Sequence, residues 1–298
     1  MPVPASLPTV GLTALGVAAI RATETARSDR LFADPCAAGF VRAAGYERPA
    51  GSAPSTQEEI TERQQLTAWI GVRTRFLDDV VLGACAHGCR QVVILGAGLD
   101  ARAFRLDFPE GTRLWELDLA GVLRFKEMVV QAEAWVPRCE RTTVEVDLSE
   151  DWGRKLQDAG FDAHARVVWV AEGLLAYLSA EVRDALIATT GALSVAGSRF
   201  GLTLAARTPP DVVRPANPRP ETKPRSYKAL FQSSAPDDPR GWLASRGWHA
   251  EFFDVAERSD SYGRPPLVSE SGVDRARLVD ASRLSETDAG LTLTHAAR

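Results

Sequence analysis

The sequence predicts an α/β protein with a mostly parallel sheet, and three observations support this. From Gln91 onward, short apolar runs of strand length alternate with segments of helical pattern. One run, Val92 to Leu95, leads directly into Gly96-Ala97-Gly98, the kind of tight turn that opens nucleotide-binding sheets. Several runs end at acidic residues, and parallel order would bring those ends to one edge. A chain of 298 residues, 45% hydrophobic and 25% charged, suits one large domain.

The overall charge does not favour nucleic acid or a membrane surface as a partner. A net charge of −4 at pH 7 and a pI near 5.7 give no electrostatic reason to expect nucleic acid or an anionic membrane. The apolar run Val10 to Ile20 is too short to cross a bilayer, and no Lys or Arg precedes it. We therefore expect no membrane span, no signal peptide and a cytoplasmic location.

The cysteines do not predict a metal site. The four cysteines form no CxxC pair. Cys85, His87 and Cys89 are close enough together to suggest half of a metal site. No second cluster supplies the missing ligands, so a turn of small residues before the strand at Gln91 is the favoured interpretation.

Two helices are expected before the sheet, in residues 1–90. Residues Thr9 to Arg30 have helical spacing, and Asp34-Pro35 forces a break after them. A second helix is expected from Thr56 to Leu82, because polar and acidic residues suited to a helix N-terminus open it. Its second half carries Arg73, which by position alone would be a surface arginine.

The core of the sheet is expected in residues 91–206. A helix should begin near Asp100, directly after the glycine turn, and others are expected at Gly121 to Ala134 and Ala180 to Leu193. The expected strands after the first are Arg113 to Leu119, Thr142 to Val146, Arg166 to Ala171 and Arg199 to Ala205.

The last third of the chain is expected to hold an insert and the end of the sheet. Residues 207–240 hold eight of the 18 prolines, which predicts irregular structure, either a lid or a solvated connector. Residues 241–298 should complete the sheet. A short helix is expected in Pro239 to Trp248, a strand in Trp248 to Val255 and a final edge strand at Leu291 to His295. All four segments would form one structural domain.

Acidic residues mark the ends of three expected strands. Glu116 and Asp118 lie two apart in the second strand, which puts them on the same side, and they follow the glycine turn by about 20 residues. That is where an acid holds a ribose in dinucleotide folds, although two exposed charges are an equally good interpretation of either acid alone. Asp147 ends the third run and Glu172 the fourth. The repetition predicts a ligand at the carboxyl ends of the strands.

Several blocks of the sequence resemble a known family. VVILGAGLDARAFRL, LWELDLAGVLRFK, VDLSEDW and VVWVAEGLLAYLS occur in an order and spacing similar to the leucine carboxyl methyltransferase-like family, in particular its bacterial S-adenosylmethionine-dependent O-methyltransferases. RATETARSDRLFADPCA, RTRFLDD and WLASRGW look like the same family. Ala101 departs from the pattern, because the bacterial branch usually has Thr there. The resemblance implies a Rossmann-like class I methyltransferase sheet with an antiparallel edge, under a cap of N-terminal helices and the irregular insert.

The resemblance also implies a cofactor, S-adenosyl-L-methionine, with S-adenosyl-L-homocysteine as its product. Gly96 and Gly98 would surround its methionine part. Arg73 would pair with the methionine carboxylate, and Glu172 would lie near the amino group and the methyl donor. For the nucleoside, the resemblance implies Asp118 with Glu116 at the ribose hydroxyls, and Asp147 with Leu148 at the adenine.

The acceptor side is expected to use residues outside the sheet. Tyr177 would face the reaction site, and Arg21 and Arg75 could orient an anionic small-molecule acceptor. For the two arginines, salt bridges to Glu24 and Asp79 on the same helix are the favoured alternative. Trp69 and residues 207–240 could cover the site.

The shortage of bases favours a carboxylate acceptor. No histidine lies in a recognised block, and His249 is only a weak candidate for a base. An ionised carboxylate needs no base, whereas a phenol does. We therefore expect a methyl ester as the product.

Two other classes of function remain open at this point. A nicotinamide-dependent oxidoreductase fits G-x-G-x-x-A at Gly96, Gly98 and Ala101, with Glu116 as the ribose acid. It does not explain the acids after the third and fourth strands. A protein that binds S-adenosylmethionine without transferring its methyl group would share every cofactor motif.

Overall fold

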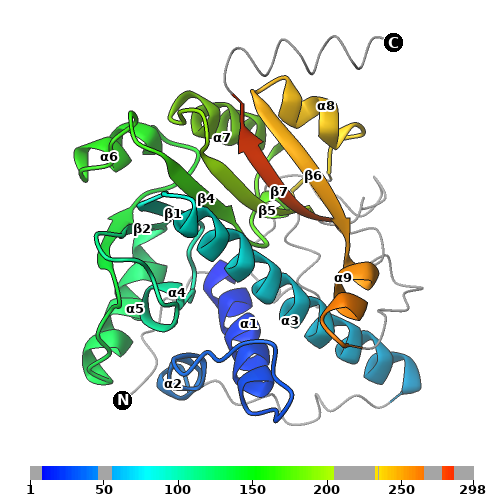
Figure 1. Ribbon diagram of the computed structural model, residues 1–298. Helices are drawn as coiled ribbons and strands as arrows, with labels where there is room; N and C mark the ends of the chain where they lie inside the picture. The colour runs from blue at the N-terminus through cyan, green and yellow to red at the C-terminus, as the bar shows by residue number, and fades with distance from the viewer. Residues whose placement is uncertain (1–8, 46–55, 205–231, 234, 265–276, 285–298) are drawn as a thin grey trace.

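A seven-stranded sheet forms the centre of the computed structural model, which describes residues 9–45, 56–204, 232–233, 235–264 and 277–284 (Figure 1). The strand order is β3-β2-β1-β4-β5-β7-β6. Only β7 runs antiparallel to its neighbours, β5 and β6. The strands are β1 (Gln91–Leu95), β2 (Arg113–Asp118), β3 (Glu140–Glu145), β4 (Val167–Ala171), β5 (Arg199–Leu204), β6 (Trp248–Asp254) and β7 (Arg277–Arg283).

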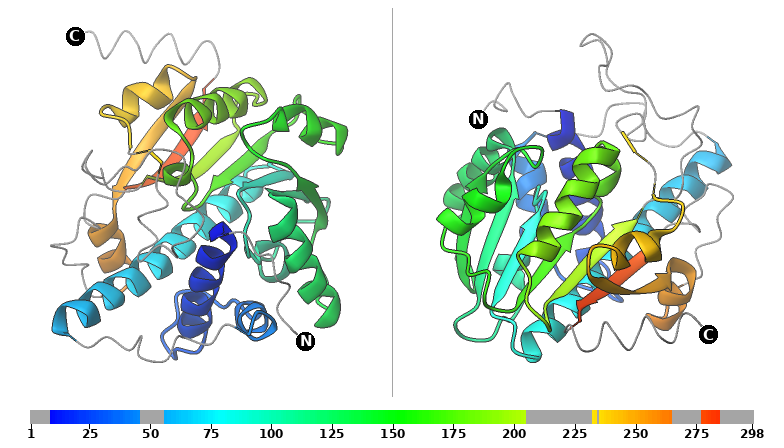
Figure 2. Two further views of the ribbon diagram at one scale, coloured as in Figure 1. Left: turned by 180° about the vertical axis from the view of Figure 1, so that it is seen from behind. Right: turned by 90° about the horizontal axis from the view of Figure 1, so that it is seen from above.

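Helices cover both faces of the sheet and give three layers. One face packs against α1 (Thr9–Thr25), α2 (Ala37–Ala43), α3 (Gln57–Ala86), α4 (Arg102–Arg105), α5 (Ala120–Ala132) and α9 (Val255–Ser261). The other face packs against α6 (Trp152–Asp158), α7 (Ala180–Ala192) and α8 (Pro239–Ala244). A short 3₁₀ helix, η1 (Leu175–Tyr177), follows β4. In Figure 2, α1 and the long α3 cross the first face.

The central strands are buried on both sides, because their side chains alternate between two cores. In β1, Val92 and Ile94 join the core under α3, whereas Val93 and Leu95 join the core under α7. Every residue of β1 and β4 is buried. Full burial of one such aliphatic side chain contributes about 1.5–3 kcal/mol. This two-sided burial explains the continuous apolar runs in the sequence.

The order of the strands reverses between β1 and β4, which is where open parallel sheets bind ligands. Ile94 pairs with Val170 and Leu95 pairs with Leu117. The carboxyl ends of β1, β2 and β4 therefore lie level with one another. The chain leaves them at Gly96, Asp118 and Glu172.

The architecture predicted from the sequence is confirmed: the sheet is mostly parallel with antiparallel pairing toward one edge. The sequence did not predict β7, α2, α6 or α9. The strand expected at Leu291 to His295 and most of residues 207–240 lie outside the described residues. In the part of the chain that the structure describes, no helix has the length and apolarity needed to traverse a bilayer.

The helix expected to begin near Asp100, directly after the glycine turn, is present as the single turn α4. α4 ends at Arg105, and Leu106 is already extended. Pro109 follows closely and disfavours helical geometry at the residue before it. The N-terminus of α4 also lacks a side-chain cap, because Ala101 has no hydrogen-bonding side chain. Instead, the Arg102 N–H donates to Asp100 Oδ1 at 2.7 Å.

Candidate functional site

A cavity of about 440 Å³ lies at the carboxyl ends of β1 to β4. α1 and η1 contribute to its walls, and the glycine turn lies along its floor. Its lining includes nearly all the residues that the sequence singled out at the strand ends: Gly96, Gly98, Asp118, Asp147, Leu148 and Glu172, together with Arg21, Arg73 and Tyr177.

The glycine turn is tied to the end of β2. Asp118 Oδ2 accepts the N–H of Gly98 at 2.6 Å, and Oδ1 accepts the N–H of Leu119 at 2.7 Å. Burial raises the pKa of Asp118, and these two N–H groups act in the opposite direction. Gly96 and Gly98 have φ values of 61° and 49°, which only glycine adopts without strain. A Cβ on Gly96 would also lie 2.7 Å from the Leu174 side chain.

The loop after β3 places a carboxylate and an apolar side chain at the rim of the cavity. Asp147 Oδ1 accepts from both the N–H and the hydroxyl of Ser149, at 2.9 and 2.8 Å. This local turn holds Asp147 in place although the residue is exposed. Leu148 follows it and is half-buried against the core under α6 and α7.

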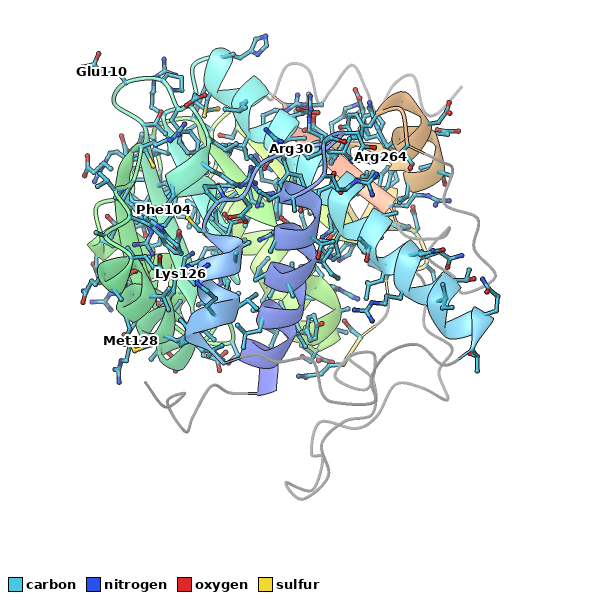
Figure 3. All side chains as sticks on the ribbon, turned by 90° about the horizontal axis from the view of Figure 1, so that it is seen from below. Arg30, Phe104, Glu110, Lys126, Met128 and Arg264 are labelled. Carbon is cyan, nitrogen blue, oxygen red and sulfur yellow. The ribbon has the colours of Figure 1, made fainter. Side chains whose placement is uncertain are left out.

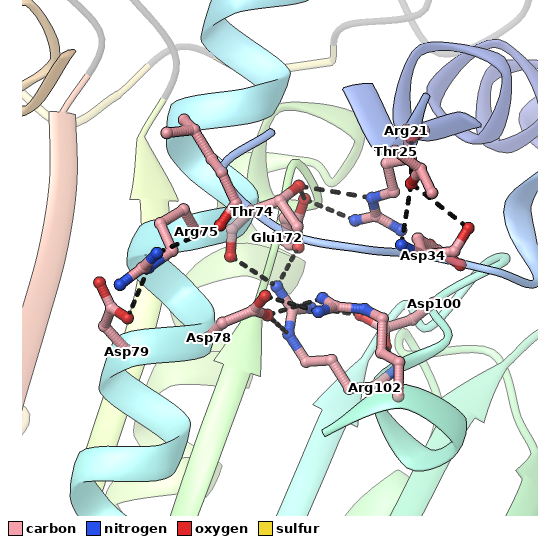
Figure 4. A network of polar contacts seen from close by, with 12 residues as sticks. Arg21, Thr25, Asp34, Thr74, Arg75, Asp78, Asp79, Asp100, Arg102 and Glu172 are labelled. Atoms are coloured by element: carbon pink, nitrogen blue, oxygen red, sulfur yellow. Dashed lines mark hydrogen bonds and ion pairs between the residues drawn. The ribbon is translucent and has the colours of Figure 1, made fainter. Parts of the chain in front are cut away.

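Glu172 is the hub of a buried charge network (Figure 4). Its Oε1 lies 2.7 Å from Arg21 Nη2 and 3.0 Å from Arg73 Nε. Its Oε2 lies 2.8 Å from Arg102 Nη2. Burial alone would raise the pKa of Glu172, but the charges of Arg21, Arg102 and Arg73 outweigh it and hold the pKa well below the ordinary value. Glu172 is therefore a carboxylate at neutral pH.

The network continues behind the cavity through Arg102. This side chain is 0% exposed and also pairs with Asp78 at 2.8 Å and with Asp100. Burial acts to raise the pKa of Asp100, yet the adjacent Arg102 lowers it. Carboxylates from α3, from the glycine loop and from the end of β4 thus meet at one guanidinium.

One wall of the cavity is formed by α1 and η1. Thr13, Val17 and Arg21 lie four residues apart on α1, so they share one face of that helix, and all three line the cavity. Tyr177 interacts with Thr13, and burial raises the pKa of Tyr177. Gln232 also lines the cavity and is held through its N–H by the carbonyl of Ala176 at 2.7 Å.

The structure places Glu116 away from the cavity, contrary to the expectation that it shares the ribose with Asp118. Glu116 is 0% exposed, and its Oε2 lies 2.7 Å from both Lys126 and Arg141. Glu116 lies two residues before Asp118 on β2 and is therefore about 6–7 Å further from the carboxyl end of the strand. This distance explains why Asp118 lines the cavity and Glu116 does not. Figure 3 labels Lys126 on the side of the molecule with α2 and α5. A nicotinamide-dependent oxidoreductase was expected to use Glu116 as its ribose acid, and the position of Glu116 outside the cavity argues against that alternative as well.

Arg75 also lies outside the cavity, so its expected acceptor role is not supported by its position. Its guanidinium pairs with Asp79 at 2.8 Å and donates to the carbonyl of Leu31 at 3.1 Å. Arg75 and Arg73 are two residues apart, which is about 200° around a helix, so the two side chains point in different directions. Arg21, by contrast, pairs with Glu172 rather than with Glu24.

Two further expected residues do not line the cavity. Trp69 lies beneath Arg73, whose guanidinium is 5.7 Å from the centre of its ring. His249 is exposed on β6. Among the described residues that line the cavity, none is a histidine or a lysine.

The sequence interpretation missed Asp100, Arg102, Thr13 and Val17. Asp100 and Arg102 could have been found from the sequence, since both are charged residues directly after the glycine turn. They were instead interpreted as part of an ordinary helix. Thr13 and Val17 gave none, since facing the cavity depends on how α1 docks.

Comparison with known proteins connects this site to a family. The family model described as leucine carboxyl methyltransferase matches residues 14–191. A Frankia alni protein, provisionally named an S-adenosyl-L-methionine-dependent methyltransferase, is 47% identical over 277 residues, covering 92% of this chain and 95% of that protein. A Streptomyces avermitilis protein with the same provisional description is 47% identical over 258 residues, covering 86% and 89%.

A solved structure supports the fold. The crystal structure of a DUF574 family protein from Streptomyces avermitilis superposes with a TM-score of 0.54 at 14% identity, covering 90% of this chain and 97% of that one. At this identity the likeness concerns the fold alone.

Proposed function

This chain belongs to the leucine carboxyl methyltransferase family, and we propose that it methylates a carboxylate oxygen of a small-molecule acceptor, giving a methyl ester. The Frankia and Streptomyces relatives, both described as S-adenosyl-L-methionine-dependent methyltransferases, align with 92% and 86% of this chain. The protein is therefore an S-adenosyl-L-methionine-dependent methyltransferase. The acceptor and the methylated atom are the part that we propose.

The charges of the cavity suit this cofactor. S-adenosylmethionine carries a positive sulfonium and a positive amino group, and carboxylates outnumber guanidinium groups in the lining. The charged lining residues are Asp100, Asp118, Asp147 and Glu172 against Arg21 and Arg73. Leu174 packs so close to the glycine turn that a Cβ on residue 96 would collide with it. The absence of a side chain at Gly96 therefore keeps space for a ligand along the turn.

The residues allow a role for each part of the cofactor. Arg73 would pair with the methionine carboxylate and Glu172 with the amino group, since both line the cavity next to the glycine turn. Asp118 would hold the ribose hydroxyls without help from Glu116. Asp147 would accept from the adenine amino group.

When bound, the cofactor supplies an electrophilic methyl group on sulfur. The protein then has to position an oxygen nucleophile and exclude water. Holding two reactants in attack geometry is worth up to about 7–11 kcal/mol, so positioning can carry most of the catalysis. Tyr177 and the α1 face with Thr13, Val17 and Arg21 are placed to hold the acceptor.

The protonation states in the cavity carry the proposal of a carboxylate acceptor. The Glu172 carboxylate is held by three arginines, and its pKa is well below the ordinary value, so it is a poor proton acceptor. The pKa of Asp100 is lowered too, and Asp118, whose pKa is raised by burial, already accepts the N–H groups of Gly98 and Leu119. A phenol would need a base, whereas a carboxylic acid is already ionised at pH 7. Arg21 offers the acceptor a positive partner.

The experiment is incubation of the protein and methyl-labelled cofactor with a panel of carboxylic acids and phenols, followed by mass spectrometry. The expected product is an ester that releases its label as methanol in mild alkali. A label that survives alkali would mean an ether and would contradict the carboxylate acceptor. Binding of cofactor without turnover of any acceptor would favour the non-transferring alternative. The Asp118→Ala variant provides the background.

A further inference from the structure

Arg102 occupies a position between the two halves of the site without lining the cavity. It is the first residue of α4, and its side chain is 0% exposed. Toward the glycine turn it pairs with Asp100, and toward β4 it lies 2.8 Å from Glu172 Oε2. Both carboxylates line the cavity. Arg102 therefore contacts the lining from behind.

The contacts use the whole guanidinium group. Nε lies 2.8 Å from Asp78, Nη1 pairs with Asp100 and Nη2 pairs with Glu172, so each nitrogen serves a different carboxylate. These three acids come from α3, from the glycine loop and from the end of β4. A guanidinium spreads its donors over three nitrogens of a rigid plane and so spans three separated groups, whereas an ammonium has all three donors on one atom.

The contact with Oε2 has a consequence for the other oxygen of Glu172. With Oε2 next to Arg102, Oε1 is turned toward Arg21 at 2.7 Å and Arg73 at 3.0 Å. The orientation of one buried carboxylate thus sets the positions of both cavity arginines.

We propose that Arg102 is a positioning residue: by holding Asp100 and Glu172 together, it fixes the glycine turn relative to Arg21 and Arg73 before the cofactor binds. This inference rests on the proposed function, because it assumes that the methionine end of the cofactor meets Arg73 and Glu172. A site whose charges are fixed in advance needs no rearrangement when the ligand arrives.

Arg105 provides a matched control. It lies in the same turn of α4, its side chain is 4% exposed, and it pairs with the same Asp78 at 2.6 Å. Its guanidinium also lies over the ring of Phe32. Loss of Arg105 therefore removes a buried arginine and an Asp78 contact, while the contact between Arg102 and Glu172 is kept.

The test measures the affinity for S-adenosylhomocysteine by calorimetry in Arg102→Lys, Arg102→Met, Arg105→Lys and Arg105→Met, with thermal unfolding of each. Arg102→Lys keeps the charge but has all its donors on one atom, so it cannot reproduce the three separate contacts, and we expect its affinity to fall by about tenfold or more. We expect both Arg105 variants to unfold at lower temperature and to bind within about twofold of wild type.

The dependence on pH separates positioning from a loss of fold. In wild type, the acidic change in affinity should come from Asp118, whose pKa is raised by burial, and not from Glu172, which stays ionised to well below its ordinary pKa. Loss of the Arg102 charge lets the pKa of Glu172 rise, so the acidic limb of the curve should move to higher pH in Arg102→Met. The titratable and charged groups around Glu172 that contribute to this limb are Arg21, Arg73, Asp78, Asp100, Arg102 and Tyr177.

Each outcome decides a different claim. Wild-type affinity in Arg102→Lys, or equal losses in Arg102→Lys and Arg105→Lys, would overturn the positioning role. If Arg102→Met does not fold, Arg102→Lys still gives the affinity comparison. Failure of wild type to bind S-adenosylhomocysteine would instead contradict the proposed function itself.

Discussion

Asp118 Oδ2 accepts the N–H of Gly98 across 2.6 Å, so the acid that ends β2 also shapes the turn that follows β1. The two residues are 20 positions apart in sequence. One carboxylate thus has two tasks, holding the loop and offering its remaining acceptor capacity to a ligand.

Asp118→Ala should weaken cofactor binding strongly. It removes charge-assisted hydrogen bonds in a mostly buried place, each worth about 1.5–3 kcal/mol, which corresponds to roughly tenfold to over a hundredfold in affinity. Calorimetry with S-adenosylhomocysteine measures this. Glu116→Gln is the control on the same strand: it should lower the unfolding temperature, because Lys126 and Arg141 lose their partner, and leave affinity nearly unchanged. Equal affinity in Asp118→Ala and wild type would contradict the assigned role.

Gly96→Ala should harm both the fold and the site. Its φ of 61° costs a residue with a Cβ about 1–2 kcal/mol, and the new Cβ would push Leu174 toward the cavity. Gly111→Ala is matched in strain, since its φ is 77°, but no atom lies within 4 Å of its Cβ position. Both variants should unfold at lower temperature, and only Gly96→Ala should lose affinity for the cofactor. A similar loss in both would mean that the effect is purely one of stability.

Arg75→Ala should leave catalysis unchanged. Its half-exposed pair with Asp79 is of a kind worth about 0.5 kcal/mol or less, and it has no contact with the cavity. Arg21→Ala should reduce kcat/KM for the acceptor by about tenfold or more, because it removes the proposed positive partner of the acceptor together with a buried ion pair to Glu172. Steady-state kinetics of the two variants check this. A large loss in Arg75→Ala would restore the acceptor role that its position argues against.

Glu172→Gln should lower the free energy of unfolding at pH 7 by about 3–5 kcal/mol, because three buried arginines lose their carboxylate. The folded-state pKa of Glu172 is depressed, so its stabilisation is present above the unfolded value of about 4.3 and is lost as pH falls toward the folded value. The stability difference between wild type and variant should therefore shrink below about pH 4. Urea unfolding at a series of pH values measures it, and a difference that does not vary with pH would contradict the linkage.

The sequence predicted those parts of the fold that depend on local patterns. β1 and β4 appear as continuous apolar runs because both of their faces are buried, and the acids after them meet because parallel strands end at one edge. β7 was missed because Arg277–Arg283, RLVDASR, is rich in polar residues, and pairing with β5 and β6 decides its conformation.

The sequence could not decide which charged residues face the cavity. Glu116 and Asp118 share a side of β2, yet only the position at the very end of the strand reaches the edge. Arg73 and Arg75 have the same chemistry, and only the docking of α3 turns one inward. Arg102 lies among apolar residues, and its burial becomes evident only when Asp78 and Glu172 are brought next to it.

The ion pair between Arg21 and Glu172 joins residues 151 positions apart. At about 5–20 residues per second, a ribosome needs roughly 8 to 30 s to make the intervening chain. For much of that interval, Arg21 and its apolar neighbours Leu15 and Ala18, all buried in the folded protein, lack the sheet that will cover them. The site is thus completed late in synthesis around a helix made earlier, and α1 needs protection from aggregation until β4 has been made.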